Sequence, residues 1–332
     1  MNNQINDVPG VRTGNAQDPA LASGVTAVVF DQPAIASIAI HGGAPGVRDA
    51  ALLELEMSVE TVDALVLSGG SAFGLDAMGG VQAWLHQQGR GFAIGASRIP
   101  IVPGAILFDL NNGGDKNWGK RNPYWDLGWK AAETASTGTF LLGTTGAGYG
   151  ATTANLKGGL GSASAQTPSG HMTGALVAVN AIGSAVIGNG PHFWAAPYER
   201  DGEFGSCGFP ARPAAADLAL QTKGGPAPRN ENTTIAIVAT NAPLTKQQAR
   251  RIAVMAHDGL ARALRPAHAP FDGDIVFVAS TGAGEPLSPA QLLETGSVAA
   301  DCLARAIARG IYEATALPFT GALPDWKSRF RP

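Results

Sequence analysis

The sequence predicts a layered protein in which strands and helices mix throughout, of the α/β or the α+β class. Apolar runs of strand length, such as residues 62–67 and 233–240, are each followed by a helical pattern of apolar residues. The chain contains no internal repeat. Its 332 residues, of which 45% are hydrophobic and 15% charged, are enough to bury one large core or two ordinary ones.

The first clear unit lies in the N-terminal third of the chain. Residues 62–67 form an apolar run that predicts a buried strand, and residues 68–74 form a glycine-containing turn. The pattern that follows predicts a helix with one apolar face, made by Phe73, Ala77, Val81 and Trp84.

The middle of the chain is rich in glycine, of which the whole sequence holds 44 residues. Such a content indicates many tight turns and close backbone approaches. Residues 143–153 read as a glycine-rich loop. Residues 176–179 and 184–187 read as a pair of strands bent around Asn180 and Gly183.

A boundary is expected near residue 230. Residues 221–231 are polar and rich in Gly and Pro, which predicts an exposed, mobile loop. Residues 233–240 follow as a strand of high β-propensity. Thr245 and Gln248 then form the pattern of a capping box, which predicts the start of a helix. The inner face of that helix is expected to hold Ile252, Met255, Ala256 and Leu260.

The last elements are a predicted strand over residues 275–279 and a predicted helix from about residue 289 to residue 316. The longest apolar stretch, residues 174–188, is interrupted by polar residues and too short to cross a membrane.

Charge and cysteine content narrow the classes of function. A net charge of −3 gives no general attraction to nucleic acid or to an anionic membrane, so a small-molecule or peptide substrate is expected. Cys207 and Cys302 lie far apart and fit neither a disulfide framework nor a metal motif. The N-terminus lacks the basic and apolar segments of a signal peptide, so we expect a cytoplasmic protein.

Thr233 is the first candidate for chemistry. A threonine at a chain terminus carries its own base, because its free α-amine has a pKa near 7.7–8.0 and lies one carbon from the hydroxyl. An internal threonine gains this amine when the preceding peptide bond breaks, and the Asn232–Thr233 junction joins a polar loop to a strand. The alternative is that Thr233 is only the first residue of a strand, which the local pattern alone favours.

Four further polar residues are candidates. Asp272 and Asp274 can orient an ammonium group or bind a metal, or they form an Asp-Gly turn, which their spacing favours. Lys157 can polarise a carbonyl or shift the protonation of an amine, or it is a solvated loop residue. Asn180 can donate to an oxyanion, or it bridges backbone groups in the core.

Several common sites are absent from the sequence. The glycine clusters lack the ending of a P-loop and the full dinucleotide-binding pattern. The six histidines form no HExxH motif and no close pair along the chain. No G-x-S-x-G motif is present, which argues against a Ser-His-Asp hydrolase.

Taken in order, these segments resemble one family: the self-processing β-peptidyl and L-/D-aminopeptidases together with the nylon-oligomer (6-aminohexanoate oligomer) hydrolases. The similarity extends over nearly the whole chain. The segments that carry it are residues 7–12, 42–46, 65–76, 101–110, 146–152, 232–241 and 271–277.

The resemblance implies a four-layer αββα sandwich, like that of N-terminal-nucleophile hydrolases. It implies a single catalytic domain over residues 1–332, cut into an α chain of residues 1–232 and a β chain of residues 233–332. It also implies an acyl-enzyme mechanism without metal or cofactor. The assembly that it implies is a homo-oligomer of αβ units, a tetramer or larger.

The resemblance also assigns roles to individual residues. It favours Thr233 as a nucleophile over the interpretation as an ordinary strand residue, which the local pattern alone favours. The residues that match the family's catalytic set are the nucleophile Thr233 and, with it, Lys157, Asn180, Asp272 and Asp274. Tyr124 matches a tyrosine near the family's active site.

The threonine favours an amide hydrolase for nylon-type oligomers or polyamides, with an aminopeptidase for short peptides or β-peptides as the alternative. Acyl transfer of the ornithine acetyltransferase type and a non-catalytic binding protein with an uncut loop are further alternatives. An aminopeptidase needs an acidic group for the substrate's ammonium, whereas an endo-acting hydrolase needs an open apolar groove. The sequence alone does not decide whether Trp118, Tyr124, Trp125 and Phe193 line such a groove.

Overall fold

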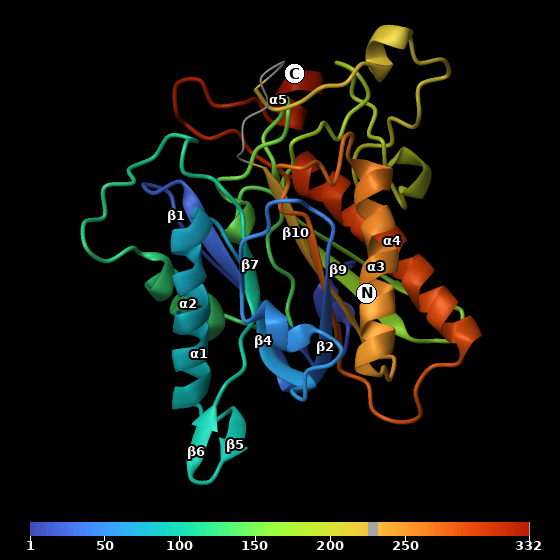
Figure 1. The fold of residues 1–332 in the computed structure, drawn as a ribbon. Helices are drawn as coiled ribbons and strands as arrows, with labels where there is room; N and C mark the ends of the chain where they lie inside the picture. Colours follow the sequence, from blue (N-terminus) through green and yellow to red (C-terminus); the bar gives the residue numbers. More distant parts are fainter. Residues whose placement is uncertain (225–231, 332) are drawn as a thin grey trace.

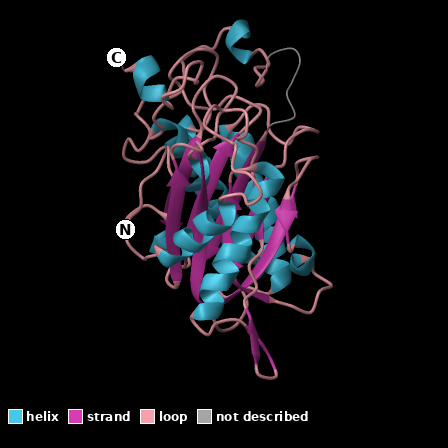
Figure 2. Ribbon diagram, turned by 90° about the vertical axis from the view of Figure 1, so that its left-hand side faces the viewer, coloured by secondary structure: helices cyan, strands magenta, loops and turns pink. Residues whose placement is uncertain are grey.

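The computed structural model describes residues 1–224 and 232–331 (Figure 1). Most of the segment 221–231, which the sequence predicts to be an exposed and mobile loop, lies outside the described residues. Figures 1 and 2 show strands between two sets of helices, with most loops gathered at the end of the sheets that also carries the C-terminus.

The strands join into one continuous hydrogen-bonded path, folded into two packed layers. The path runs in the order β3, β7, β4, β2, β11, β10, β9, β8, and β1 pairs with β2. Their bounds are β1 Val11–Asp18, β2 Ser23–Ile40, β3 Val47–Arg48, β4 Thr61–Ser68, β7 Gly104–Ile106, β8 Gly159–Gln166, β9 Met172–Asn180, β10 Thr233–Thr240 and β11 Ile275–Ser280. A separate hairpin, β5 Phe92–Ile94 and β6 Ser97–Ile99, projects from the end opposite the loops (Figure 1).

The long strand β2 connects the two layers. Its first part pairs with β1, from Ser23 to Phe30, and its last part pairs with β11, from Ile35 to Ile40. Between these parts the register with β4 shifts at residues 29–34, which bends the strand.

Five α-helices complete the described fold: α1 Ala77–Gln87, α2 Tyr124–Glu133, α3 Lys246–Ala263, α4 Pro289–Tyr312 and α5 Trp326–Phe330. Short 3₁₀ turns span Ile5–Asp7, Ala50–Leu53, Ser71–Asp76, Gly146–Gly148, Ala196–Tyr198 and Ala215–Leu218. Among the described residues, no helix is both long enough and apolar enough to cross a membrane.

Three apolar cores separate four layers. The first sheet consists of β1, β3, β4, β7 and the first part of β2, and the second sheet consists of the last part of β2 with β11, β10, β9 and β8. One core lies between the first sheet and helices α1 and α2, and a second lies between the two sheets. A third lies between the second sheet and helices α3 and α4. Strand β10 belongs to two of them, because alternate side chains point to opposite faces. Ile235 and Ile237 enter the core between the sheets, whereas Ala236 and Val238 face the helices. The αββα sandwich is therefore confirmed.

The N-terminal predictions hold for the strand and for part of the helix. The run 62–67 lies within β4, and Ala77 and Val81 are buried on α1. Phe73 was expected on the same face, but it lies in the 3₁₀ turn before α1 and is 49% exposed. The helical periodicity therefore begins only after the turn.

The C-terminal predictions are mostly confirmed. Thr245 caps α3 and forms the capping box with Gln248, and the strand 275–279 lies within β11. Helix α4 ends at Tyr312, four residues earlier than expected. The expected partner strand at residues 184–187 is wrong: Ser184 and Val186 form only isolated bridges, and β9 pairs with β8 and β10 instead.

Candidate active site

The candidate residues converge because four strand ends meet at one edge of the second sheet. Strands β10 and β11 are parallel, so both begin there, while β9 runs antiparallel to β10 and ends there. Thr233 opens β10 directly opposite Asn180, the last residue of β9. Asn232 pairs with Asp272 in a parallel bridge just before β11. Lys157 precedes β8 at the same edge.

Thr233 is buried, and its hydroxyl lies against the peptide bond that precedes it. Its Oγ donates a hydrogen bond to the carbonyl oxygen of Asn232. The backbone N–H of Gly273 donates to the same oxygen at 3.2 Å. The Asn232 carbonyl oxygen thus accepts from both the Thr233 hydroxyl and the N–H of Gly273, and fixed donors on a carbonyl oxygen are a feature of acyl-transfer sites.

Gly273 was not predicted from the sequence, where it reads only as the middle of Asp-Gly-Asp. A Cβ at this position would lie 2.9 Å from Oγ and 3.0 Å from Cγ2 of Thr233. It would also lie 3.0 Å from the carbonyl oxygen of Ala44. Only glycine leaves room for the threonine side chain in its present place.

Asp274 fixes the start of β10. Its Oδ1 accepts the backbone N–H of Thr234 at 2.9 Å. Its Oδ2 accepts both the backbone N–H and the ring Nδ1–H of His268, each at 2.8 Å. The carboxylate thus ties Thr234 to the loop before β11.

Asp272 is also buried, but only one of its oxygens is engaged. Oδ2 accepts the N–H of Ala269 at 3.1 Å, whereas Oδ1 has no hydrogen-bond partner among the described residues. Burial raises the pKa of this carboxyl to about 7, and the charge of Asp274 adds to the rise. The pair does form a turn, since the N–H of Asp272 bonds the carbonyl of Ala269. An ordinary solvated turn would not leave a carboxyl oxygen buried and unsatisfied.

Lys157 is not the solvated loop lysine that its glycine neighbours allowed, because only 1% of its surface is exposed. Its Nζ donates to the carbonyl oxygens of Gly148, Ala151 and Gly158, at 3.1, 2.8 and 2.9 Å. Burial lowers the pKa of the amine to about 7, against the opposing charge of Asp109. Three accepting carbonyls use all three donors of an ammonium group. Lys157 therefore has no donor left for a further group in this arrangement.

Asn180 bridges several groups at the end of β9. Its Oδ1 accepts the N–H of Thr152 at 3.0 Å and the Nζ of Lys223 at 3.1 Å. Its Nδ2 donates to the carbonyl oxygen of Phe108 at 2.9 Å. This is the bridging arrangement of a core asparagine, and it holds the amide firmly opposite Thr233. Lys223 was not among the predicted site residues, since one lysine in a polar loop carries no local signal.

Tyr124 belongs to a separate hydrogen-bond network, formed with Ser23 and Asp109. Its ring is fully buried beneath Gly70, and its hydroxyl donates to Oγ of Ser23 at 3.1 Å. Ser23 donates in turn to Oδ2 of Asp109 at 2.6 Å, and Oδ1 of Asp109 accepts the N–H of Gly70 at 2.8 Å. Burial raises the pKa of Tyr124, and the charge of Asp109 adds to this. Tyr124 therefore supports Asp109.

A cleft of about 370 Å³ opens beside Lys157, whereas its described lining does not include Thr233, Asn180, Asp272 or Asp274. Its lining includes Asp109, Thr152, Lys157, Lys223 and Leu323. None of the four aromatic residues considered for an apolar groove belongs to the described lining. The cleft thus combines one carboxyl group with two amines.

Comparison with known proteins identifies the family. Residues 3–322 match Peptidase family S58.

The chain belongs to Peptidase family S58.

An "uncharacterized aminopeptidase" of Mycobacterium tuberculosis is 43% identical, over 99% of this chain and 98% of that protein. A 6-aminohexanoate-oligomer endohydrolase of Paenarthrobacter ureafaciens is 25% identical, over 83% of this chain and 74% of that protein. The structure of an L-aminopeptidase D-Ala-esterase/amidase from Ochrobactrum anthropi, described as a variant of the Ntn-hydrolase fold, superposes with a TM-score of 0.71. It is 19% identical, covering 99% of this chain and 92% of that one. This S58 chain is therefore an amide or peptide hydrolase with an Ntn-like fold.

Proposed function

We propose that this S58 chain is a self-activating aminopeptidase whose nucleophile is Thr233, freed by cleavage of the Asn232–Thr233 bond. The observation that carries the proposal is the contact of the Thr233 hydroxyl with the Asn232 carbonyl, on which the N–H of Gly273 also bonds. The nucleophile and the donor to the carbonyl oxygen thus meet at the bond to be cut.

Self-cleavage begins when Oγ of Thr233 attacks the carbonyl carbon of Asn232. A C–O bond forms, the hydroxyl proton passes to the amide nitrogen of Thr233, and the C–N bond breaks to leave an ester. Gly273 stabilises the negative charge that develops on the carbonyl oxygen. The amine of Thr233 is free once the C–N bond has broken, and one water then hydrolyses the ester to give the carboxylate of Asn232 and to restore the hydroxyl of Thr233.

Substrate hydrolysis repeats this chemistry on another amide. Thr233 Oγ attacks the substrate carbonyl, its own amine takes the proton and passes it to the leaving nitrogen, and water releases the acyl group. Asp272 offers its unpartnered Oδ1 to the Thr233 ammonium, and Asp274 positions the strand. The charge of Lys157 and the amide of Asn180 stabilise the oxyanion.

The cleft favours an aminopeptidase. A substrate with a free ammonium group needs a carboxyl in the binding cleft, and the carboxyl of the described lining is that of Asp109, whose oxygens already accept hydrogen bonds from Ser23 and Gly70. The polyamide hydrolase that the threonine first favoured needs an open apolar groove, and the described lining provides none of the expected aromatic residues. Nylon-type oligomers remain the second candidate, because of the endohydrolase relative and the shared threonine.

The deciding experiment compares three substrates on purified protein: an α-aminoacyl nitroanilide, a β-aminoacyl nitroanilide and an aminohexanoate oligomer. We expect nitroaniline release from an aminoacyl substrate, and no release when its amine is acetylated. Efficient cleavage of both the acetylated substrate and the oligomer would instead support the endohydrolase. Transfer of the acyl group to an added amine would support the acyltransferase alternative.

Exchanging either aspartate for asparagine separates their two roles. Asp272→Asn removes a carboxyl group in which one buried oxygen, Oδ1, has no hydrogen-bond partner among the described residues. We therefore expect slower hydrolysis and an unchanged or higher Tm. Asp274→Asn leaves the N–H donors of Thr234 and His268 without their charged acceptor, so we expect lower activity and a lower Tm. Breaking such a buried pair costs about 3–5 kcal/mol. If half of this affects only the transition state, the rate falls roughly tenfold to a hundredfold.

The readouts are the initial hydrolysis rate, the extent of self-cleavage and the thermal transition of each variant. Wild-type rates in both variants would reduce the pair to a structural turn, since asparagine suits the same turn.

We also propose a homo-oligomer, a tetramer or larger assembly of αβ units, as the resemblance implied. Light scattering is expected to give a mass several times the 33.8 kDa of one chain. A mass near 33.8 kDa at micromolar concentration would contradict this.

A further inference from the structure

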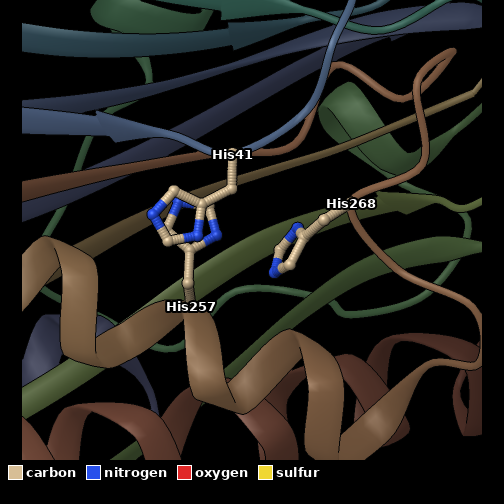
Figure 3. Close-up of side chains that lie close together, drawn as sticks. All are labelled: His41, His257 and His268. Carbon is tan, nitrogen blue, oxygen red and sulfur yellow. The ribbon is translucent and has the colours of Figure 1, made fainter.

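Three of the six histidines, which form no motif along the chain, meet in space (Figure 3), and one of them, His268, bonds Asp274. His41 follows the end of β2, His257 lies on α3, and His268 lies in the loop before β11. One nitrogen from each ring lies within 4.8 Å of the corresponding nitrogens of the other two. The rings of His41 and His257 stack at 3.8 Å, and His268 lies edge-on to both.

His257 presents a bare nitrogen to this cluster. Its Nε2 lies 3.0 Å from the carbonyl oxygen of Ala39, and because a carbonyl only accepts, this nitrogen carries the hydrogen. In the neutral ring the lone pair is then on Nδ1. That atom is buried and has no hydrogen-bond partner among the described residues, and the side chain is 2% exposed. Burial lowers the pKa of His257 to about 3, so the ring stays neutral.

His268 is oriented by a carboxylate. Its Nδ1 donates to Oδ2 of Asp274 at 2.8 Å, which directs the other nitrogen away from Asp274. A carboxylate behind the ring is the usual outer partner of a metal-binding histidine, since it fixes the tautomer and raises the basicity of the ligand. His41 is exposed at the third corner and gives the cluster access to solvent.

We propose that His41, His257 and His268 bind one Zn²⁺ or a similar imidazole-preferring transition-metal ion, with water as the fourth ligand. Three protein nitrogens and one open position form a common tetrahedral zinc site. Zn–N bonds of about 2.0–2.1 Å place the ligand nitrogens roughly 3.4 Å apart. The rings must therefore close in by about an ångström from their widest separation, and rotation of the exposed His41 ring allows this. Other charges nearby are those of Arg250 and Asp258, which face His41, and Asp272, which faces His268.

The ion would link the end of β2 to helix α3 and to the loop that carries the aspartate pair, which lie more than 200 residues further along the chain. Binding requires a deprotonated nitrogen on His268, whose pKa is raised by Asp274 despite burial, so affinity falls as the pH is lowered. The inference concerns a site separate from the nucleophile and does not depend on self-cleavage.

The test uses the full-length Thr233→Ala variant, in which no new amino terminus forms to compete for metal. After treatment with a chelator, Zn²⁺ is titrated in by calorimetry and Co²⁺ by visible absorption. We expect one equivalent of each, an intense Co²⁺ spectrum typical of four-coordinate geometry, and a higher Tm with metal. His41→Ala changes an exposed ligand and is expected to weaken binding at least tenfold, while Asp274→Asn weakens it roughly tenfold to a hundredfold.

His86→Ala is the matched control, because His86 is an exposed histidine outside the cluster. It is expected to bind Zn²⁺ as the parent protein does. The proposal is overturned if no stoichiometric binding occurs, if His41→Ala binds with parental affinity, or if Co²⁺ gives only a weak six-coordinate spectrum. It is overturned equally if His86→Ala weakens binding as much as His41→Ala.

Discussion

Replacing Thr233 with alanine is expected to leave one uncut chain of 33.8 kDa with no amide hydrolase activity. The wild-type protein is expected to separate into residues 1–232 and 233–332 under denaturing conditions. The change removes the Oγ that contacts the Asn232 carbonyl, and no other side-chain hydroxyl is bonded to that oxygen among the described residues. Denaturing electrophoresis, intact mass and N-terminal sequencing of the smaller fragment measure the effect.

Two matched variants make the result specific. Thr233→Ser keeps the hydroxyl and is expected to retain cleavage and activity. Thr234→Ala removes the neighbouring hydroxyl, which has no hydrogen-bond partner among the described residues, and is expected to be cut normally. A fragment that begins at any residue other than Thr233, or full activity in the uncut chain, would overturn the mechanism.

The sequence predicts the layers of the fold well, because its strongest signals are local. The high β-propensity of residues 233–240 and the capping box at Thr245 each depend on a few neighbouring residues. The prediction of a strand at residues 184–187 was wrong, because an apolar run does not specify its pairing partner. Whether a run joins a ladder depends on strands elsewhere in the chain.

The site was predictable only in part, and for a related reason. Thr233 and the two aspartates occupy loop-to-strand junctions, which a sequence reveals, and the family resemblance assigned their roles. The burial of Lys157 was not visible locally, because two of its three carbonyl partners, Gly148 and Ala151, lie on the folded glycine-rich loop. The histidine cluster joins segments more than 200 residues apart, and no local motif records such a meeting.

Gly273→Ala is expected to slow both self-cleavage and hydrolysis roughly tenfold to a hundredfold, although it leaves every proposed catalytic side chain in place. The added Cβ would lie 2.9 Å from Oγ and 3.0 Å from Cγ2 of Thr233, well inside ordinary contact. The Ala44 carbonyl on its other side, at 3.0 Å, limits how far the loop can retreat. The threonine must therefore move or rotate away from the Asn232 carbonyl, and a displacement of about 1 Å can cost a hundredfold in rate.

The control for this variant is Gly138→Ala, because a Cβ at Gly138 meets nothing closer than Oγ of Ser136 at 3.7 Å. Single-turnover processing of freshly refolded protein and steady-state hydrolysis are measured for both variants, on samples with comparable thermal transitions. A loss of cleavage in Gly273→Ala with a retained fold means that the alanine displaces the nucleophile from its target carbonyl. Wild-type processing in this variant would mean that the Thr233 side chain works from a different position, and that the N–H of Gly273 does not bond the reacting carbonyl oxygen.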